Sequence, residues 1–96
     1  MVSDKEADVV THFRAEVVKA GGVERLIAYR GRKGCADHLA GFPYNRLFLV
    51  ELKRPKGGRI SAHQEQDERD WYAVGVQKVY LYTREAVDHW IARVRA

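Results

Sequence analysis

The chain has 96 residues, the size of one domain with a single core. Its 17 lysine and arginine residues outnumber 13 acids, and the formal net charge of +4 favours a polyanionic partner such as nucleic acid. The single cysteine excludes an internal disulfide and suits a reducing compartment. No apolar run approaches the ~18 residues of a membrane span, and no secretory leader is evident, so we expect a cytoplasmic protein with no membrane partner.

Hydrophobic periodicity and turn residues predict three helices and four strands in the order α-β-β-β-α-β-α. The expected helices cover about 4–20, 61–74 and 84–94, and the expected strands cover 25–29, 35–39, 46–54 and 76–82. Ser3 with Glu6, and Ser61 with Gln64, have the spacing of capping boxes at the first two helix starts. Gly75 has the position of a C-cap, where a left-handed backbone suits glycine.

The last strand–helix–strand unit determines much of the topology. Because a strand, a crossover helix and a second strand form a right-handed unit, the strands at 46–54 and 76–82 should be parallel. The earlier strands are joined by short turns and should pair antiparallel. We therefore expect a single domain over 1–96 of the α/β class, with a mixed sheet flanked by helices on both faces and a C-terminal helix.

The strand at 46–54 ends in a pattern that indicates chemistry. After the apolar run 47–50, Glu51 and Lys53 share one face of the strand, about 6.6 Å apart at ~3.3 Å per residue. A second acid, Asp37, lies one hairpin upstream. Two acids can hold Mg²⁺ while Lys53 assists a bound water or a phosphate. The alternative is a surface ion pair of Glu51 with Lys53 or Arg54 on an exposed strand end.

Basic residues lie on both sides of this pattern in the sequence. They suit contacts with the phosphates on either side of a scissile bond, and the alternative is a pair of solvated loops. The residues expected to bind DNA are Arg30, Arg32, Lys33, Lys56 and Arg59. Structural zinc is not expected, because one cysteine and scattered histidines lack the usual ligand spacing.

These residues belong to an ordered set of short motifs, which are Gly34-x-x-Asp37, Glu51-Leu52-Lys53 and Gln64. The set resembles the virus-type replication-repair nuclease (VRR-NUC) domain, a branch of the PD-(D/E)xK nuclease superfamily. Trp71 and Gly75 also fall where that family tends to place an aromatic residue and a glycine. One position departs from the family pattern, because the residue before the acid is usually proline and here is Ala36.

The resemblance covers nearly the whole chain and implies a restriction-endonuclease-like α-β-β-β-α-β core. It implies a metal site in which Asp37, Glu51 and the carbonyl of Leu52 bind Mg²⁺ or Mn²⁺. Lys53 and Gln64 would then assist the reaction as further catalytic residues.

Two of the implied site residues have structural alternatives. The resemblance leads us to expect an acid on the first helix, where Glu6 lies near the centre of the apolar stripe and Glu16 lies well off it. The alternative for Glu6 is its capping box with Ser3. Gln64 would contact the attacking water or a phosphate, or would only cap the helix with Ser61. The two roles of Gln64 are compatible.

The resulting hypothesis is a metal-dependent DNA endonuclease that hydrolyses phosphodiester bonds in a bacterial or phage-infected cell. Because stand-alone members of the family resemble dimeric junction resolvases, we expect a homodimer that prefers four-way (Holliday) junctions, as in DNA repair. Two other classes remain open, an inactive DNA-binding module with the same fold and a protein-interaction domain with a structural metal site. Candidate interface residues, which alternatively pack on the sheet, are Tyr82, Trp90, Ile91 and Val94.

Overall fold

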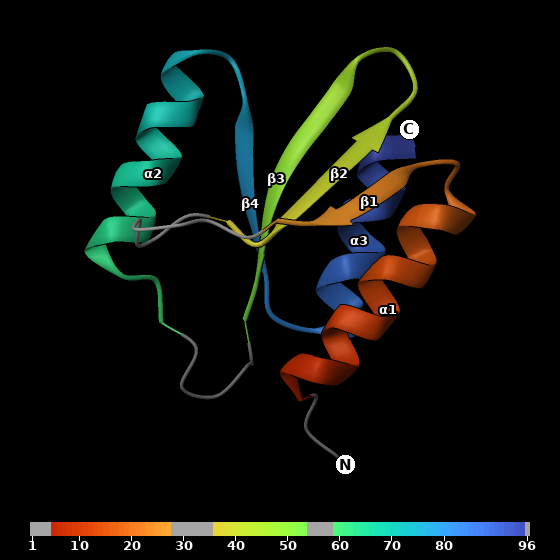
Figure 1. Ribbon diagram of the computed structural model, residues 1–96. Coiled ribbons are helices and arrows are strands. Elements are labelled where there is room, and N and C mark those ends of the chain that lie inside the picture. The colour runs from red at the N-terminus through yellow and green to blue at the C-terminus, as the bar shows by residue number, and fades with distance from the viewer. Residues whose placement is uncertain (1–4, 28–35, 54–58, 96) are drawn as a thin grey trace.

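The computed structural model describes residues 5–27, 36–53 and 59–95, which form a four-stranded sheet with helices on both faces (Figure 1). In chain order the elements are α1 (Glu6–Lys19), β1 (Val23–Leu26), β2 (His38–Phe42), β3 (Arg46–Leu52), α2 (Ala62–Ala73), β4 (Gln77–Leu81) and α3 (Arg84–Arg95). The predicted order α-β-β-β-α-β-α is confirmed.

The sheet is mixed, and its strands lie side by side in the order β1-β2-β3-β4. β1 with β2, and β2 with β3, are antiparallel, whereas β3 and β4 are parallel, as the helix that connects them requires. The predicted pairing directions are therefore confirmed. The parallel pair brings the C-terminal ends of β3 and β4 to the same edge of the sheet, with Glu51 beside Tyr80 and Leu52 beside Leu81.

Some strand boundaries differ from the prediction. Gly41 and Phe42, which lie beyond the strand expected at 35–39, belong to β2 and continue its pairing with β3. The turn therefore has only three residues, 43–45, and Tyr44 and Asn45 adopt positive φ angles of 69° and 60°. Pairing with a neighbouring strand here overrides the local preference of glycine for a turn.

The hydrophobic core lies on one face of the sheet, beneath α1 and α3. Phe13 of α1 stacks on Trp90 of α3 with 6.1 Å between ring centroids. Phe42 and Phe48 from the sheet approach Trp90 edge-on at 5.7 and 5.4 Å. Such offset and edge-on contacts between large rings tie the two helices to the strands.

The C-terminal helix packs on the sheet, so one of the two alternatives for its apolar residues is decided. Trp90, Ile91 and Val94 are only 4–7% exposed and belong to the core. Because they are covered within one molecule, they are not the dimer surface that the sequence suggested. Tyr82 is half-buried just before the helix.

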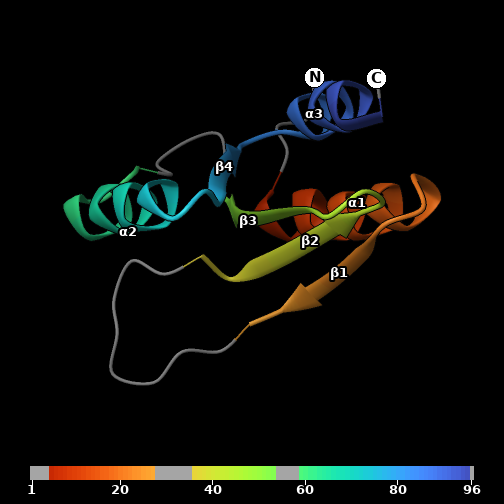
Figure 2. The ribbon, with the colours of Figure 1, turned by 90° about the horizontal axis from the view of Figure 1, so that it is seen from above.

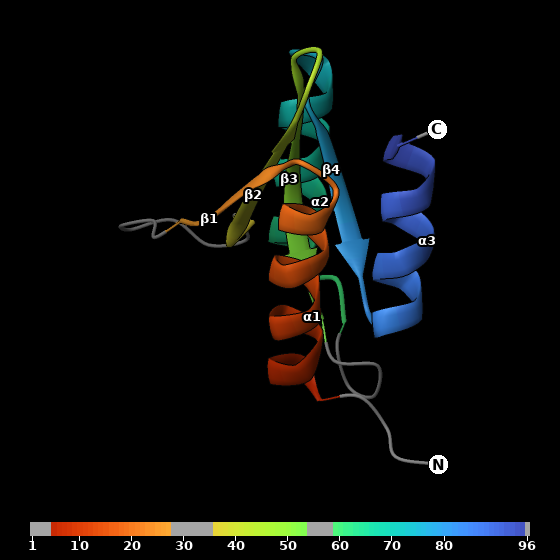
Figure 3. The same ribbon diagram turned by 90° about the vertical axis from the view of Figure 1, so that its right-hand side faces the viewer.

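Helix α2 covers the opposite face of the sheet, as Figures 2 and 3 show. Here the contact is polar, because the residues that α2 buries are Gln64 and Asp67. They meet Glu51 of β3 and Lys78 of β4, which are also buried. The α1 side of the sheet is therefore mostly apolar, apart from the buried pair of His38 with Glu24, and the α2 side is polar.

The helix ends agree with the sequence in α2 and differ in α1. The N-cap of α1 is Lys5 rather than Ser3, and its main-chain N–H is 3.3 Å from Asp8 Oδ2. Ser3 and the side chain of Glu6, which the sequence pairs in a capping box, lie outside the described residues. Gly75 follows the end of α2 with a φ of 87°, as a glycine stop requires. In the described part of the chain, no helix is both long and apolar enough to cross a membrane.

Candidate active site

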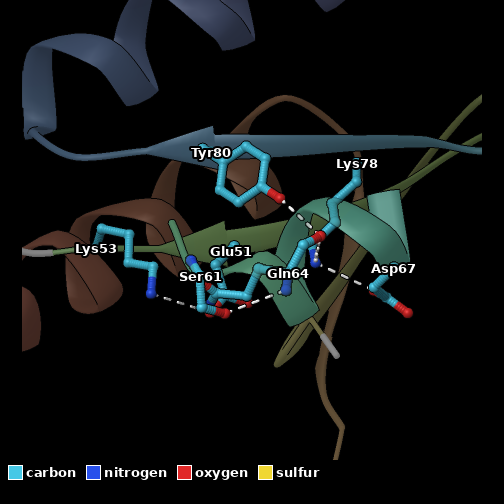
Figure 4. Close-up of polar contacts among 7 residues, drawn as sticks. All are labelled: Glu51, Lys53, Ser61, Gln64, Asp67, Lys78 and Tyr80. Atoms are coloured by element: carbon cyan, nitrogen blue, oxygen red, sulfur yellow. Dashed lines mark hydrogen bonds and ion pairs between the residues drawn. The ribbon is translucent and has the colours of Figure 1, made fainter. Parts of the chain in front are cut away.

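Glu51 is a charged residue at a buried position near the end of β3. The residue is 6% exposed, because its side chain faces α2 (Figure 4). Its Oε1 accepts a hydrogen bond from Gln64 Nε2 at 2.5 Å and lies 3.7 Å from Lys53 Nζ. The alternative of an exposed surface ion pair is therefore wrong for Glu51 with Lys53, and Arg54 lies outside the described residues.

The second oxygen of this carboxylate, Glu51 Oε2, is buried and has no hydrogen-bond partner among the described residues. Burial raises the pKa of Glu51 above its ordinary value of 4.5, and the negative charge of Asp37 raises this pKa further. Lys53, Lys78 and the hydrogen bond from Gln64 act in the opposite direction. A buried oxygen without a partner is costly, and a hard divalent cation is the kind of ligand that would satisfy it.

Asp37 lies directly before β2, at the same edge of the sheet as Glu51. Because His38 pairs with Val50 in antiparallel register, the next position along β2 places Asp37 opposite Glu51. The Asp37 side chain is exposed, while its main-chain oxygen accepts a hydrogen bond from the N–H of Ile27 at 2.6 Å. The site thus combines one buried and one solvent-facing carboxylate.

Lys53 continues β3 past its last residue, Leu52. Its main-chain N–H donates to the carbonyl of Leu81 at 2.9 Å, so the alignment with β4 extends to this position. The Lys53 side chain is 16% exposed and reaches back towards Glu51, as expected for two residues on one face of a strand. One ammonium group is therefore held beside the carboxylate while remaining in contact with solvent.

Gln64 has both of the contacts that a capping residue and a site residue would make. Its main-chain N–H donates to Ser61 Oγ at 3.1 Å, and its Oε1 accepts from the N–H of Ser61 at 2.9 Å, which confirms the predicted capping box. Its remaining amide group, Nε2, donates to Glu51. The amide thus contacts the carboxylate directly, whereas the sequence predicted contact with water or phosphate.

Other predicted residues are only partly placed. Arg30, Arg32, Lys33 and Lys56 lie outside the described residues, as does the side chain of Glu6. The first turn of α1 lies at the same end of the molecule as the C-terminal end of β3 (Figure 1). Arg59 is exposed just before α2, and Leu52 has its side chain in the core. Their roles as metal or DNA ligands stay predictions.

One group of His, Asp and Glu side chains with converging ligand atoms occurs among the described residues, and it lies away from Glu51. It consists of His12 and Glu16 on α1 and Asp88 on α3, on the opposite side of the sheet. His12 Nε2 is 2.6 Å from Asp88 Oδ1, and Glu16 pairs with Lys19 at 3.0 Å. The His12–Asp88 contact joins α1 to α3, whereas the Glu16–Lys19 pair lies within α1.

Sequence reasoning missed three polar residues that surround Gln64. Lys78 and Tyr80 of β4 both donate to the main-chain oxygen of Gln64, and Lys78 also pairs with Asp67. Two signals were present in the sequence. Gln64 and Asp67 are three apart and share a helix face, and Lys78 and Tyr80 are two apart and share a strand face.

Comparisons with known proteins agree with this architecture. A solved structure described as a VRR_NUC domain superposes with a TM-score of 0.82 at 24% identity, over 91% of this chain and 94% of that one. The chain has the VRR-NUC fold. It is also 28% identical over 81 residues to "Putative nuclease p44" of Acyrthosiphon pisum secondary endosymbiont phage 1, covering 84% of this chain and 86% of that protein. No family model matches the chain.

The VRR-NUC fold and its restriction-endonuclease-like core were predicted from the motifs, and both are confirmed. The superposition extends over 91% of the chain, so the likeness is to the whole domain rather than to one motif. The prediction held although Ala36 stands where the family usually has proline. The order of the elements and motifs therefore outweighs one turn residue.

The buried carboxylate generates a stability prediction. Glu51→Gln should stabilise the metal-free protein at pH 7 by roughly 1 kcal/mol, because it removes a buried charge whose Oε2 has no partner. In a domain of this size, that corresponds to a rise of about 4–8 °C in the thermal midpoint. Circular dichroism melts in chelating buffer measure it.

The pH dependence supplies the control. Since the folded-state pKa of Glu51 is raised, its ionisation costs nothing well below the ordinary value of 4.5; the penalty on the folded state grows as pH rises above that value and is complete above the raised pKa. The advantage of Glu51→Gln should therefore shrink towards zero well below pH 4.5. A variant that is less stable than the wild type at pH 7 would contradict the assignment of a buried, unsatisfied charge.

Proposed function

We propose that this protein is a metal-dependent endonuclease that hydrolyses phosphodiester bonds in DNA. The observation that carries the proposal is the convergence of buried Glu51, exposed Asp37 and partly buried Lys53 at one end of the sheet. One oxygen of Glu51 has no hydrogen-bond partner among the described residues. The VRR-NUC fold and the phage relative named as a nuclease support the same reaction class.

The residues fit a hard divalent cation. Asp37 and Glu51 offer carboxylate oxygens, and we propose that the Leu52 carbonyl and Glu6 complete the protein ligands. Such oxygen ligands suit Mg²⁺ or Mn²⁺, which keep several waters and bind substrate phosphate. When bound, the cation would polarise a phosphoryl oxygen and acidify a water molecule.

The protein's own groups then have separate tasks. The Lys53 ammonium, held 3.7 Å from Glu51, can donate to a phosphate oxygen or to the attacking water as negative charge develops on the phosphate. Gln64 holds Glu51 Oε1, so Oε2 would be the oxygen available to a bound cation. This division lets one carboxylate serve both the protein framework and the metal.

An inactive DNA-binding module is the main alternative. Such a module gains nothing from a buried Glu51, because a desolvated carboxylate with an unsatisfied oxygen costs stability. The retention of Lys53 beside Glu51 likewise has no use in a module that only binds phosphates. The internal arrangement thus favours an active enzyme over an inactive relative and over a protein-interaction domain.

For the substrate, we propose branched DNA in a bacterial or phage-infected cell, bound by a homodimer. The predicted phosphate contacts, Arg30, Arg32, Lys33, Lys56 and Arg59, flank Asp37 and the end of β3 in sequence. A protein of this size offers little surface for a junction by itself. Two copies related by a two-fold axis would present two sites to the like-polarity strands of a four-way junction, as repair of such junctions requires.

Alanine substitution of the converging residues tests the reaction class. Asp37→Ala, Glu51→Ala and Lys53→Ala should each lower the rate of DNA cleavage with Mg²⁺ or Mn²⁺ by about 100-fold or more, beyond the 10–100-fold typical of outer-shell changes. Gel assays with labelled DNA measure the rate, and circular dichroism checks folding.

The acids on α1 provide the matched control. Glu6→Gln should lose cleavage, whereas Glu16→Gln, which removes only the surface pair with Lys19, should cleave as the wild type does. The reverse order would show that the wrong acid was assigned to the metal. Equal cleavage by the wild type and Glu51→Ala would remove the basis for the nuclease assignment.

Substrate preference and assembly are tested together. At micromolar concentration, light scattering should give the mass of a dimer, and cleavage of a four-way junction should exceed cleavage of linear duplex by at least about tenfold. Binding should weaken steeply between about 50 and 200 mM salt, because phosphate contacts release counterions. A monomer that cuts both substrates equally would contradict the junction model but not the metal-nuclease proposal.

A further inference from the structure

Helix α2 is joined to the sheet by an ion pair that is almost fully withdrawn from solvent. Lys78 Nζ lies 3.1 Å from Asp67 Oδ2, and the two side chains are 0% and 5% exposed (Figure 4). An isolated charge at such a position would be very costly, so each partner depends on the other. Neither residue is among those that the motifs identify as catalytic.

The same lysine also holds the main chain at Gln64. Lys78 Nζ donates to the Gln64 carbonyl at 3.2 Å, and Tyr80 Oη donates to the same oxygen at 3.1 Å. Burial, together with the charge of Glu68 and its hydrogen bond to the phenol, raises the pKa of Tyr80, so the phenol stays protonated. Two strand residues therefore converge on one carbonyl in the first turn of α2.

The Gln64 side chain is held at its other end. Its Oε1 is used by the N–H of Ser61, so only Nε2 is available to turn towards the sheet, and it donates to Glu51 Oε1. With its main chain fixed from β4 and its amide oriented by the cap, Gln64 has one direction left for its last hydrogen bond. The orientation of the Glu51 carboxylate follows from these contacts.

We infer that Lys78 and Asp67 are positioning residues of the active site: they hold the first turn of α2 so that Gln64 fixes Glu51 with Oε2 directed to the cation. The inference rests on the proposed function and extends it to a second layer of residues. Partners of this kind behind a metal ligand commonly change metal affinity or activity 10–100-fold when removed.

The polar character of this interface supports a role other than stability. Replacing a buried ion pair by apolar residues of similar volume is often neutral or stabilising, so a fold under pressure for stability alone would not require Lys78 and Asp67. An apolar replacement would leave the Gln64 carbonyl with one side-chain donor fewer. Stability and site geometry can therefore be separated by experiment.

The test is the paired variant Lys78→Met/Asp67→Leu, made in the full chain. We expect its thermal midpoint to equal or exceed that of the wild type, while cleavage falls about 10-fold or more. In metal-free protein, the side-chain amide resonances of Gln64 should exchange slowly with water in the wild type and fast in the paired variant. The amide readout needs neither metal nor activity.

A double-variant comparison shows whether the pair acts through Gln64. In a Gln64→Ala background, the paired substitution should cause no further loss of cleavage, because residues that act as a unit are not additive. Losses that multiply, or a paired variant with wild-type cleavage and a protected Gln64 amide, would overturn the inference. A paired variant that does not fold would also overturn it, because it would make the ion pair structural.

A milder pair of variants tests the contacts at the Gln64 carbonyl without removing the ion pair. Tyr80→Phe removes one donor to the Gln64 carbonyl and should speed exchange of the Gln64 amide, whereas Tyr72→Phe, at an exposed position on the same helix, should not. If these amide effects appear but wild-type protein cleaves no DNA with Mg²⁺ or Mn²⁺, the network exists and the proposed function fails. If cleavage occurs without the amide effects, only the positioning role fails.

Discussion

The hydrogen bond from Gln64 Nε2 to Glu51 Oε1 is the contact on which the rest of the site depends. It joins α2 to β3 across the polar face of the sheet, and it uses only one of the two oxygens of the Glu51 carboxylate. One oxygen is held by the protein, and the other is buried with no hydrogen-bond partner in the described part of the chain. A carboxylate in this state is poorly suited to a structural role and well suited to a cation.

The fold explains how such a contact is possible. The crossover from β3 to β4 places α2 over one face of the sheet. The parallel pairing puts Glu51 beside Tyr80, near the C-terminal ends of both strands. The opposite face carries the aromatic core with α1 and α3. The stabilising apolar core is therefore on the α1 and α3 side. The charged and amide groups, whose burial costs free energy, lie on the other side, under α2.

Much of the fold could be predicted from the sequence, because each local signal agreed with the next. The apolar run Leu47–Val50 predicted β3, and the capping box at Ser61 with the glycine stop at Gly75 predicted α2. The crossover predicted the strand directions. The boundaries of β2 were wrong because its last residues, Gly41 and Phe42, favour a turn locally and are held in the strand by pairing with β3.

The candidate site was predictable only in its motif residues. Asp37, Glu51, Lys53 and Gln64 could be named from spacing and resemblance, and the structure brings them to one sheet edge. The second layer could not be named, because Lys78 and Asp67 become neighbours only when α2 lies on β4. Residue spacing predicts which side chains share a face of one helix or strand. It does not predict which helix face will contact which strand, because that depends on the fold.

The central claim is that Asp37 and Glu51 bind a divalent cation, and paramagnetic broadening tests it most directly. Mn²⁺ is titrated into isotopically labelled wild-type protein and the Glu51→Gln variant without DNA. If the two carboxylates bind the cation, the amide signals of Asp37, Glu51 and Leu52 should broaden first in the wild type, and this broadening should be lost in the variant. Broadening centred on His12, Glu16 and Asp88, or equal broadening in both proteins, would contradict it.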